Sequence, residues 1–348
     1  MKYKKVCIEA FGYEIPDNIV KSSQIEERLS SLYERFNLHH GRLEMMTGIK
    51  ERRFFNNGTK PSDASIKASE KAMAKAGIKR EDVDFLLHCS VCRDFLEPAT
   101  ATTVHKSLKL PSKTGIFDIS NACLGFLNGM VTLANMIELE QIKTGIVVAT
   151  ETSEILIEKT IKDLLEDKSM TKTKLRLYMA SLTLGSGAAA VILTHSSISR
   201  TGHKLLGGSS RTASQHNGLC RVVPDACFYS NNHPAMQTNA EELIKNGHLL
   251  ALDTWEATKK ELGWSNEDVD KVSCHQIGAT QRKPLLDLLG LDLSKDFSTA
   301  HYLGNIGSVS LPITFAIGVE EGFIEQSDKV AMLGIGSGLV CLMLGVEW

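Results

Sequence analysis

The feature that most constrains the fold of this chain is an internal repeat. The segment Arg80-Glu-Asp-Val-Asp-Phe-Leu-Leu-His in the first half is echoed by Asn266-Glu-Asp-Val-Asp-Lys-Val-Ser-Cys in the second. Residues 135–148 and 318–332 form another pair at nearly the same offset, each with a helix end, a polar turn and a strand. The repeated order of strand, helix and strand predicts one fold used twice.

The boundaries of the two copies follow from length and composition. A chain of 348 residues is expected to form two units of about 175 residues each. Short β-branched runs alternate with amphipathic segments, which predicts an α/β class. A Gly-, Ser- and Asn-rich stretch without periodicity separates the copies. We expect a first half over residues 1–195, a connecting or cap segment over 196–235, and a second half over 236–348.

Charge and cysteine content exclude several classes of protein. With 39 basic against 41 acidic residues, the chain has no global field that would draw nucleic acid or an anionic membrane. No apolar run is long enough for a membrane span, and the N-terminus lacks the pattern of a signal peptide. The eight cysteines are scattered, which favours free thiols and a cytoplasmic location.

Cys123 is the candidate nucleophile. It lies where the strand-like start of Asp118-Ile-Ser-Asn-Ala-Cys-Leu-Gly-Phe runs into a helix that is apolar nearly all round and hence buried. Most free cysteines are small buried hydrophobes, but the positive end of a helix favours a thiolate. We therefore expect a reactive Cys123 with a lowered pKa.

The repeat identifies two polar partners for this cysteine. Asn305 occupies in the second copy the position that Cys123 has in the first, although a helix-capping role would equally suit an asparagine. His275 follows the strand-like run Val269–Cys274, at the end of a strand. A lone histidine is more often structural, but here topology predicts that three unlike groups converge.

These residues carry a resemblance that covers nearly the whole chain. The run Asn121-Ala-Cys-Leu-Gly-Phe-Leu-Asn-Gly, the pair His275-Gln276, Gly304-Asn305 and Gly334-Ile-Gly-Ser-Gly-Leu resemble the ketoacyl synthase III branch of the thiolase superfamily. Within that branch, Cys92-Arg-Asp-Phe-Leu-Glu-Pro-Ala-Thr-Ala is similar to the OleA condensing enzymes. The resemblance implies duplicated βαβαβαββ halves in a five-layered α-β-α-β-α arrangement.

The resemblance also implies a mechanism and a homodimer. Cys123 would take an acyl group from a thioester, with the backbone N–H groups of Cys123 and Ser337 as the oxyanion hole. His275 and Asn305 would stabilise the enolate of a second thioester, which attacks the acyl enzyme. Substrates would be CoA or acyl-carrier-protein thioesters, with no tightly bound cofactor.

The possible condensing enzymes differ in how the second thioester becomes a carbanion. OleA-like enzymes deprotonate an acyl-CoA with a glutamate from the partner subunit, and Glu97 matches that position, although an ordinary surface carboxylate is the simpler interpretation. Decarboxylating ketoacyl synthases use a malonyl thioester instead. A non-catalytic partner subunit, or acyl transfer without condensation, are further alternatives.

Weaker signals concern the carrier and metals. Where the ketoacyl synthase III pattern has Ala-Asn-x-Arg after the His-Gln pair, this chain has Ile277-Gly-Ala-Thr-Gln-Arg-Lys, so Arg282 or Lys283 is a candidate contact for CoA or carrier phosphates. The motif Cys89-Ser-Val-Cys92 has no second pair at zinc spacing, so no metal site is expected.

Overall fold

The computed structural model describes residues 1–223 and 235–348 and is built around one nine-stranded sheet. Its order is β11-β12-β13-β8-β1-β7-β6-β4-β5. The strands of the first half are β1 (Val6–Glu14), β4 (Phe85–His88), β5 (Gly115–Asp118), β6 (Thr144–Glu151) and β7 (Gly187–His195). Those of the second half are β8 (Lys204–Thr212), β11 (Lys271–Cys274), β12 (Lys329–Gly336) and β13 (Val340–Glu347).

The two halves repeat the same strand pairing. In the first, β4 and β6 are parallel and β6, β7 and β1 are antiparallel. In the second, β11 and β12 are parallel and β12, β13 and β8 are antiparallel. The counterpart of β5 is reduced to a single parallel bridge between Val272 and Asp296. The halves join where β1 pairs antiparallel with β8, at Cys7 and Lys204. The predicted duplication is therefore visible in the topology.

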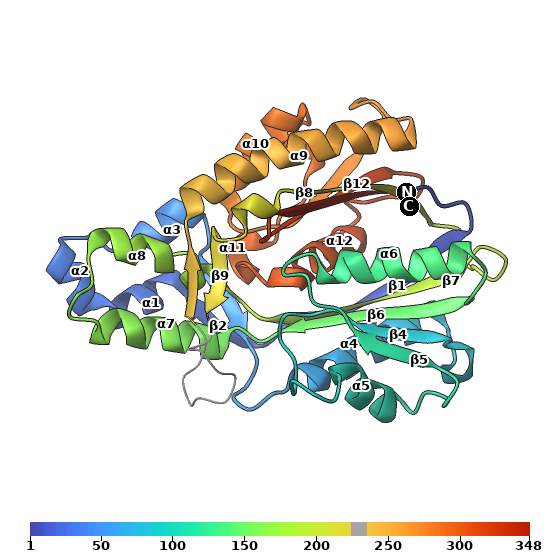
Figure 1. Cartoon of the computed structure of the whole chain (residues 1–348), viewed down its shortest axis with the longest axis horizontal. Coiled ribbons are helices and arrows are strands. Elements are labelled where there is room, and N and C mark those ends of the chain that lie inside the picture. Colours follow the sequence, from blue (N-terminus) through green and yellow to red (C-terminus); the bar gives the residue numbers. More distant parts are fainter. Residues whose placement is uncertain (224–234) are drawn as a thin grey trace.

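Helices cover both halves in five layers (Figure 1). Strand side chains alternate between faces, so Val147 and Ala149 of β6 join the central core while Ile146 and Val148 join an outer one. The central layer is α6 (Gly125–Glu138) and α12 (Ser310–Glu320). The outer layers are α4 (Pro61–Ala76) with α5 (Thr100–Leu108), and α9 (Ala240–Leu262) with α10 (Arg282–Leu289). This confirms the α-β-α-β-α prediction.

A side lobe extends from one end of the sheet, at the left of Figure 1, and has an apolar core of its own. Its elements are β2 (Asn18–Lys21), α1 (Ser22–Arg28), α2 (Ser30–Phe36), α3 (Arg42–Thr47), β3 (Glu51–Phe54), α7 (Glu154–Glu166), α8 (Lys172–Tyr178), β9 (Cys220–Val223) and β10 (Ala235–Thr238).

The prediction of a connecting segment over 196–235 is wrong for its first part, because residues 204–212 form the sheet strand β8. Two glycines make this strand look like a loop. A Cβ on Gly207 would lie 2.1 Å from the carbonyl oxygen of Met1, and one on Gly208 would lie 1.9 Å from that of Met343. Glycine is needed here for close backbone approach. Residues 224–234 of the predicted cap lie outside the described residues.

A close approach between β1 and α4 gives a stability prediction. A Cβ on Gly12 would lie 2.3 Å from the carbonyl oxygen of Ala68 and 2.4 Å from the backbone nitrogen of Ala72. We expect Gly12→Ala to lower the free energy of unfolding by about 1–3 kcal/mol, because backbone must move apart in a close-packed region. Urea denaturation measures this. Gly218→Ala is the control, since nothing lies within 4 Å of its Cβ position. Equal stability of the two variants would contradict the packing argument.

Candidate active site

Cys123 lies between β5 and α6, on a short bridge that Ala122 shapes by adopting a positive φ of 45°. The helix begins only at Gly125, two residues beyond the cysteine. The predicted lowering of the thiol pKa is wrong: burial, and then the charges of Cys220 and Glu151, raise the pKa of Cys123 to about 12. Loss of hydration outweighs the helix dipole. Cys123 is therefore a thiol at neutral pH and requires a base to become nucleophilic.

The end of strand β12 lies close to this cysteine and to the start of α6. A Cβ on Gly336 would lie 3.5 Å from the backbone nitrogen of Cys123, and one on Gly334 would lie 2.6 Å from Cδ2 of Leu124. Glycine at both positions lets the end of β12 approach the start of α6. Ser337 directly follows Gly336, at the end of β12.

His275 follows the last residue of β11, as predicted, and its backbone N–H donates to the carbonyl of Leu333 on β12 at 2.9 Å. Its Nδ1 and Nε2 atoms are both buried and have no hydrogen-bond partner in residues 1–223 and 235–348. Burial lowers its pKa to about 4. Buried polar atoms in protein interiors nearly always have a hydrogen-bond partner. The two ring nitrogens of His275 are therefore available to hydrogen-bond a ligand.

Asn305 lies just before the 3₁₀ turn η6 (Gly307–Val309) that leads into α12. Its backbone N–H donates to Thr183 O, and its carbonyl accepts from Gly185 N, both at 2.9 Å. Its Oδ1 accepts the N–H of Gly307, two residues on, at 3.0 Å, but Asn305 caps neither helix, because the N-cap of η6 is Ile306 and that of α12 is Val309. The side-chain NH₂ group makes no hydrogen bond within the described part of the chain.

Two buried polar residues that sequence reasoning missed hold this arrangement together. The side-chain oxygen of Gln276 accepts from Ser298, Thr299 and Ala300, and its backbone N–H donates to Ser310 Oγ at 3.1 Å. Gln276 thus fixes the segment that leads to Asn305 relative to His275. Glu151, at the end of β6, accepts the hydroxyl of Ser308 at 2.5 Å. Burial of a polar side chain that accepts several hydrogen bonds identifies such residues in the structure. The sequence alone does not reveal that burial.

Glu97 lies on a segment that we call the arm, residues 89–99, and its side chain is exposed in the single chain. The arm is firmly held. Backbone N–H groups of Val91 and Cys92 donate to Glu151 at 3.1 and 3.2 Å, and Asp94 accepts the N–H of Ser62 at 2.9 Å. The structure therefore places Glu97 on a fixed support at the surface, apart from the buried nitrogens of His275.

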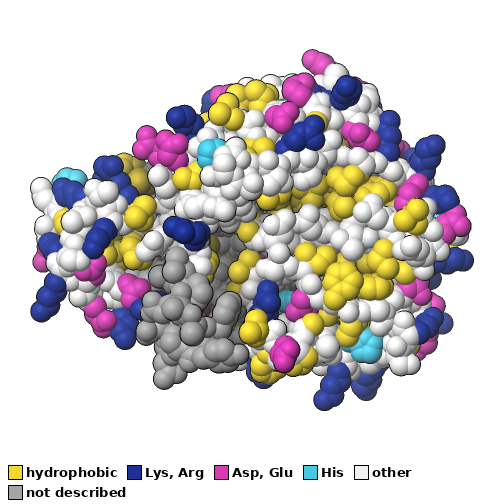
Figure 2. All heavy atoms as spheres, viewed as in Figure 1, with side chains coloured by type: hydrophobic (Ala, Val, Ile, Leu, Met, Phe, Trp, Pro, Cys, Tyr) yellow, Lys and Arg dark blue, Asp and Glu magenta, His cyan; other side chains and the backbone are white. Residues whose placement is uncertain are grey.

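Exposed apolar side chains lie next to Glu97 in the chain and on the edge strand β5. Phe95 and Leu96 are 49% and 58% exposed, and Phe117 is 41% exposed on β5, the edge strand of the sheet. Figure 2 shows hydrophobic side chains gathered on the face that carries β4 and β5 in Figure 1. An edge strand with exposed aromatic side chains ordinarily needs a cover.

The two basic candidates have different surroundings. Arg282 Nε lies 2.6 Å from Asp296 Oδ2, and Nη2 donates to the carbonyl of the same residue at 2.6 Å. Because Asp296 is buried, this pair fixes the start of α10. Lys283 is largely exposed and lies 2.6 Å from Asp287 on the same helix. Arg282 thus has a structural partner, and Lys283 is the freer of the two.

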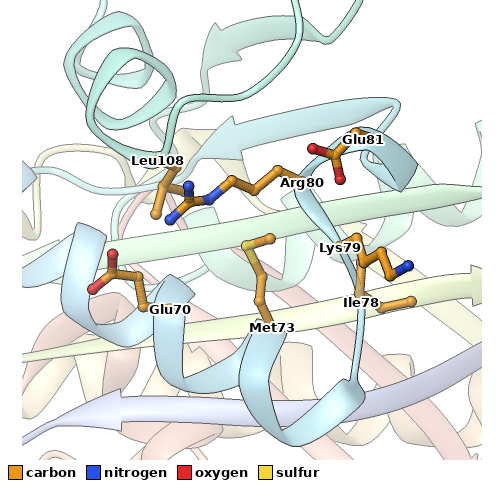
Figure 3. Close-up of a pocket in the computed structure, with 7 residues that line it drawn as sticks. All are labelled: Glu70, Met73, Ile78, Lys79, Arg80, Glu81 and Leu108. Carbon is orange, nitrogen blue, oxygen red and sulfur yellow. The ribbon is translucent and has the colours of Figure 1, made fainter.

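One further pocket lies away from the catalytic candidates. A shallow pocket lies between α4, α5 and the turn η1 (Arg80–Asp82), lined by Glu70, Met73, Ile78, Lys79, Arg80, Glu81 and Leu108 (Figure 3). It is on the opposite face of the sheet from α6 and the catalytic candidates. Within residues 1–223 and 235–348, no group of three His, Cys, Asp or Glu side chains is placed to hold a metal, and no helix is long and apolar enough to cross a membrane.

Comparisons with known proteins agree with this geometry. Residues 117–213 match the family model of 3-oxoacyl-[acyl-carrier-protein] synthase III, and residues 260–348 match the model of its C-terminal region. The chain is 44% identical to an acyl-CoA:acyl-CoA alkyltransferase of Shewanella oneidensis and 34% identical to one of Xanthomonas campestris, over the full length of both chains in each case.

Solved structures give the same result. OleA of Xanthomonas campestris, in a form with a cysteine replaced by alanine, matches with a TM-score of 0.94 and 34% identity over 100% of this chain and 98% of that one. A β-ketoacyl-[acyl-carrier-protein] synthase III of Natranaerobius thermophilus is 25% identical over 98% of both chains. The chain therefore belongs to the ketoacyl synthase III family of thiolase-like condensing enzymes, in the branch that contains the OleA alkyltransferases.

Proposed function

We propose that this enzyme joins two acyl-CoA molecules in a non-decarboxylative Claisen condensation. The observation that carries the proposal is His275 at the end of β11, whose two buried ring nitrogens have no partner among residues 1–223 and 235–348 and whose neighbouring strand β12 ends close to the backbone of Cys123. The choice of acyl-CoA rests on the relatives named acyl-CoA:acyl-CoA alkyltransferase, which are more similar to this chain than the 25% identical ketoacyl synthase III.

In the first half-reaction, Cys123 Sγ attacks the carbonyl carbon of an acyl-CoA. As Sγ bonds to the carbonyl carbon, the thiol proton passes to the neutral imidazole of His275 in the same step, so that no free thiolate forms. The backbone N–H groups of Cys123 and Ser337 stabilise the oxyanion. CoA leaves with the proton, and a thioester remains on Cys123.

In the second half-reaction, Glu97 of a partner subunit removes a proton from the α-carbon of the next acyl-CoA. His275 and the side-chain NH₂ of Asn305 hydrogen-bond the enolate oxygen. The α-carbon then attacks the acyl thioester, a carbon–carbon bond forms, and Cys123 leaves with a proton to give a β-ketoacyl-CoA. Among the solved OleA structures are forms substituted at a cysteine, a glutamate and a histidine, and that glutamate precedes that cysteine by as many residues as Glu97 precedes Cys123.

A homodimer would bring Glu97 into the second site. Its support is the exposed apolar surface of Phe95 and Leu96, which precede Glu97, and of Phe117 on the edge strand β5. Sedimentation analysis tests the dimer. Lys283 and, with the Nη1 atom that does not bond Asp296, Arg282 are the proposed contacts for CoA phosphates. The enzyme would work in the cytoplasm, where its cysteines stay reduced.

The test is to incubate the enzyme with a long-chain acyl-CoA alone and, separately, with acyl-CoA plus a malonyl thioester. A β-keto product, or the ketone derived from it, from acyl-CoA alone supports the proposal. Strict dependence on the malonyl thioester would replace it with decarboxylative condensation. Release of free acid would point to hydrolysis, and a Cys123 that is never acylated would point to a non-catalytic subunit.

The shifted pKa values predict an unusual pH profile for the first half-reaction. His275, with a pKa of about 4, stays in its base form, and Cys123, with a pKa of about 12, stays a thiol, across the neutral range. The first release of CoA is thus expected to keep a constant rate from about pH 8 down to about pH 5. Stopped-flow thiol detection measures this. A decline with a midpoint near 6.5 would show an ordinary histidine and contradict the assignment.

A further inference from the structure

Glu151 is a buried carboxylate beside the site that the proposed reaction does not use. It ends β6 and is 4% exposed. Its Oε1 accepts the backbone N–H of Val91 at 3.1 Å and the hydroxyl of Ser308 at 2.5 Å, and its Oε2 accepts the N–H of Cys92 at 3.2 Å. All three partners are donors, so the hydrogen bonds favour the ionised carboxylate and partly offset its burial, which raises the pKa of Glu151.

The hydrogen-bond partners of Glu151 belong to two different segments, the arm and the loop that follows Asn305. Val91 and Cys92 begin the arm that carries Glu97, whereas Ser308 lies three residues after Asn305. The side chain of Glu151 is packed tightly against the loop that contains Gly307 and Ser308. Gly307 has a φ of +57°, and a Cβ there would lie 3.1 Å from Cγ of Glu151. A single side chain therefore ties the start of the arm to the loop that positions Asn305.

The arm is also held by hydrogen bonds that do not involve Glu151. Asp94 accepts the N–H of Ser62 at 2.9 Å, and its own N–H donates to Thr100 Oγ1 at 3.1 Å. These contacts fix the middle of the arm to the outer helices α4 and α5. On the side of the catalytic residues, the arm is tied to β6 by the contacts to Glu151, by the Thr150 N–H, which donates to Ser90 Oγ at 2.7 Å, and by the Cys89 N–H, which donates to the carbonyl of Val148 at 2.7 Å. Of these β6 residues, Glu151 also accepts the hydroxyl of Ser308.

We propose that Glu151 is a positioning residue that sets Asn305 of its own site and, through the arm, Glu97 in the site of the partner subunit. Each Glu151 would then serve two active sites. The inference rests on the proposed function, in which Glu97 acts across the dimer. It concerns the second half-reaction only, since acylation of Cys123 uses neither Asn305 nor Glu97.

The first experiment separates the half-reactions in Glu151→Gln. The amide cannot accept all three donors, so the arm and the Asn305 loop lose their common anchor. We expect the first release of CoA to persist, while formation of β-keto product falls about 10²-fold, as a displacement of about 1 Å would cause. Loss of both steps in the same proportion would overturn the proposal, since a merely structural role would do that.

Glu26→Gln is a matched control. Glu26 is also buried and also accepts two backbone N–H groups, from Gly41 and Leu43, and one hydroxyl, from Tyr33, but in the side lobe. It is expected to lose comparable thermal stability and to keep the ratio of the two steps unchanged. Ser308→Ala, which removes only the contact to the Asn305 loop, provides a second variant if Glu151→Gln fails to fold, and is likewise expected to lower condensation selectively. An unchanged ratio of steps in Ser308→Ala would overturn the proposal.

The second experiment uses mixed dimers of a Glu97→Gln chain and a Cys123→Ala chain, co-purified with two tags. Their one working site has the cysteine of the first chain and the glutamate of the second. Glu151→Gln is expected to lower condensation whether it is placed on the first chain, through Asn305, or on the second, through the arm. An effect from one placement alone would overturn the link between sites. A mixed dimer that is inactive without Glu151→Gln would instead refute Glu97 as a base in trans, and the ratio of steps in the first experiment would still decide whether Glu151 is a positioning residue.

Discussion

Replacement of Cys123 by alanine is expected to abolish condensation, with a loss of about 10⁴-fold or more, as for other enzymes deprived of their nucleophile. Without the thiol no acyl enzyme forms, and the enolate of the second substrate has no thioester to attack. The loss should appear as the absence of any acyl adduct by intact-protein mass spectrometry after incubation with acyl-CoA, together with the absence of CoA release.

Cys220→Ala is a suitable control for this variant. Cys220 is also partly exposed, and its charge acts on Cys123. It should leave the adduct on Cys123 in place. An acyl adduct that persists in Cys123→Ala, at any other residue, would show that the nucleophile has been assigned wrongly.

Replacement of Glu97 by glutamine is expected to lower condensation about 10²–10⁴-fold, which is the usual contribution of a general base. The isosteric amide keeps the shape of the arm but cannot accept the α-proton. The first release of CoA should persist at its normal rate, because it depends on Cys123 and His275. The two steps are measured as burst and steady-state phases of thiol release.

Mixed dimers of two inactive variants test whether Glu97 acts in the active site of the partner subunit. Glu97→Gln and Cys123→Ala are each inactive as homodimers, but their mixed dimer should recover activity from its single complete site. Glu81→Gln, at another exposed carboxylate of the same half, should change neither step. Full condensation by Glu97→Gln homodimers would refute the base assignment and favour a substrate that supplies its carbanion by decarboxylation.

Much of the site was predictable because topology is encoded in the repeat. The repeat placed Cys123 and Asn305 at equivalent positions, and the strand before His275 placed that residue at the same edge. Each of these expectations depends on the order of elements along the chain. The structure places each residue at the end of the element where it was expected, and the convergence and catalytic roles of the three residues stay a prediction.

What could not be predicted depends on burial and close approach. The pKa of Cys123 was predicted in the wrong direction because the helix begins at Gly125 and because loss of hydration exceeds the dipole effect. Strand β8 was missed because Gly207 and Gly208, needed for backbone contact, give it the composition of a loop. Glu151 looked like any carboxylate after a strand, since its three donors come from residues 91, 92 and 308.

The shared central layer has a consequence for synthesis of the protein on the ribosome. Strand β1 finds its first sheet partner only when β7 (Gly187–His195) has emerged, which makes its pairing strongly non-local and slow. Even then, the apolar face that carries α6 stays partly uncovered until α12 (Ser310–Glu320) arrives from near the end of the chain. We therefore expect the nascent first half to engage chaperones for a long interval, and to gain a working thiol only after nearly all of the chain has been made.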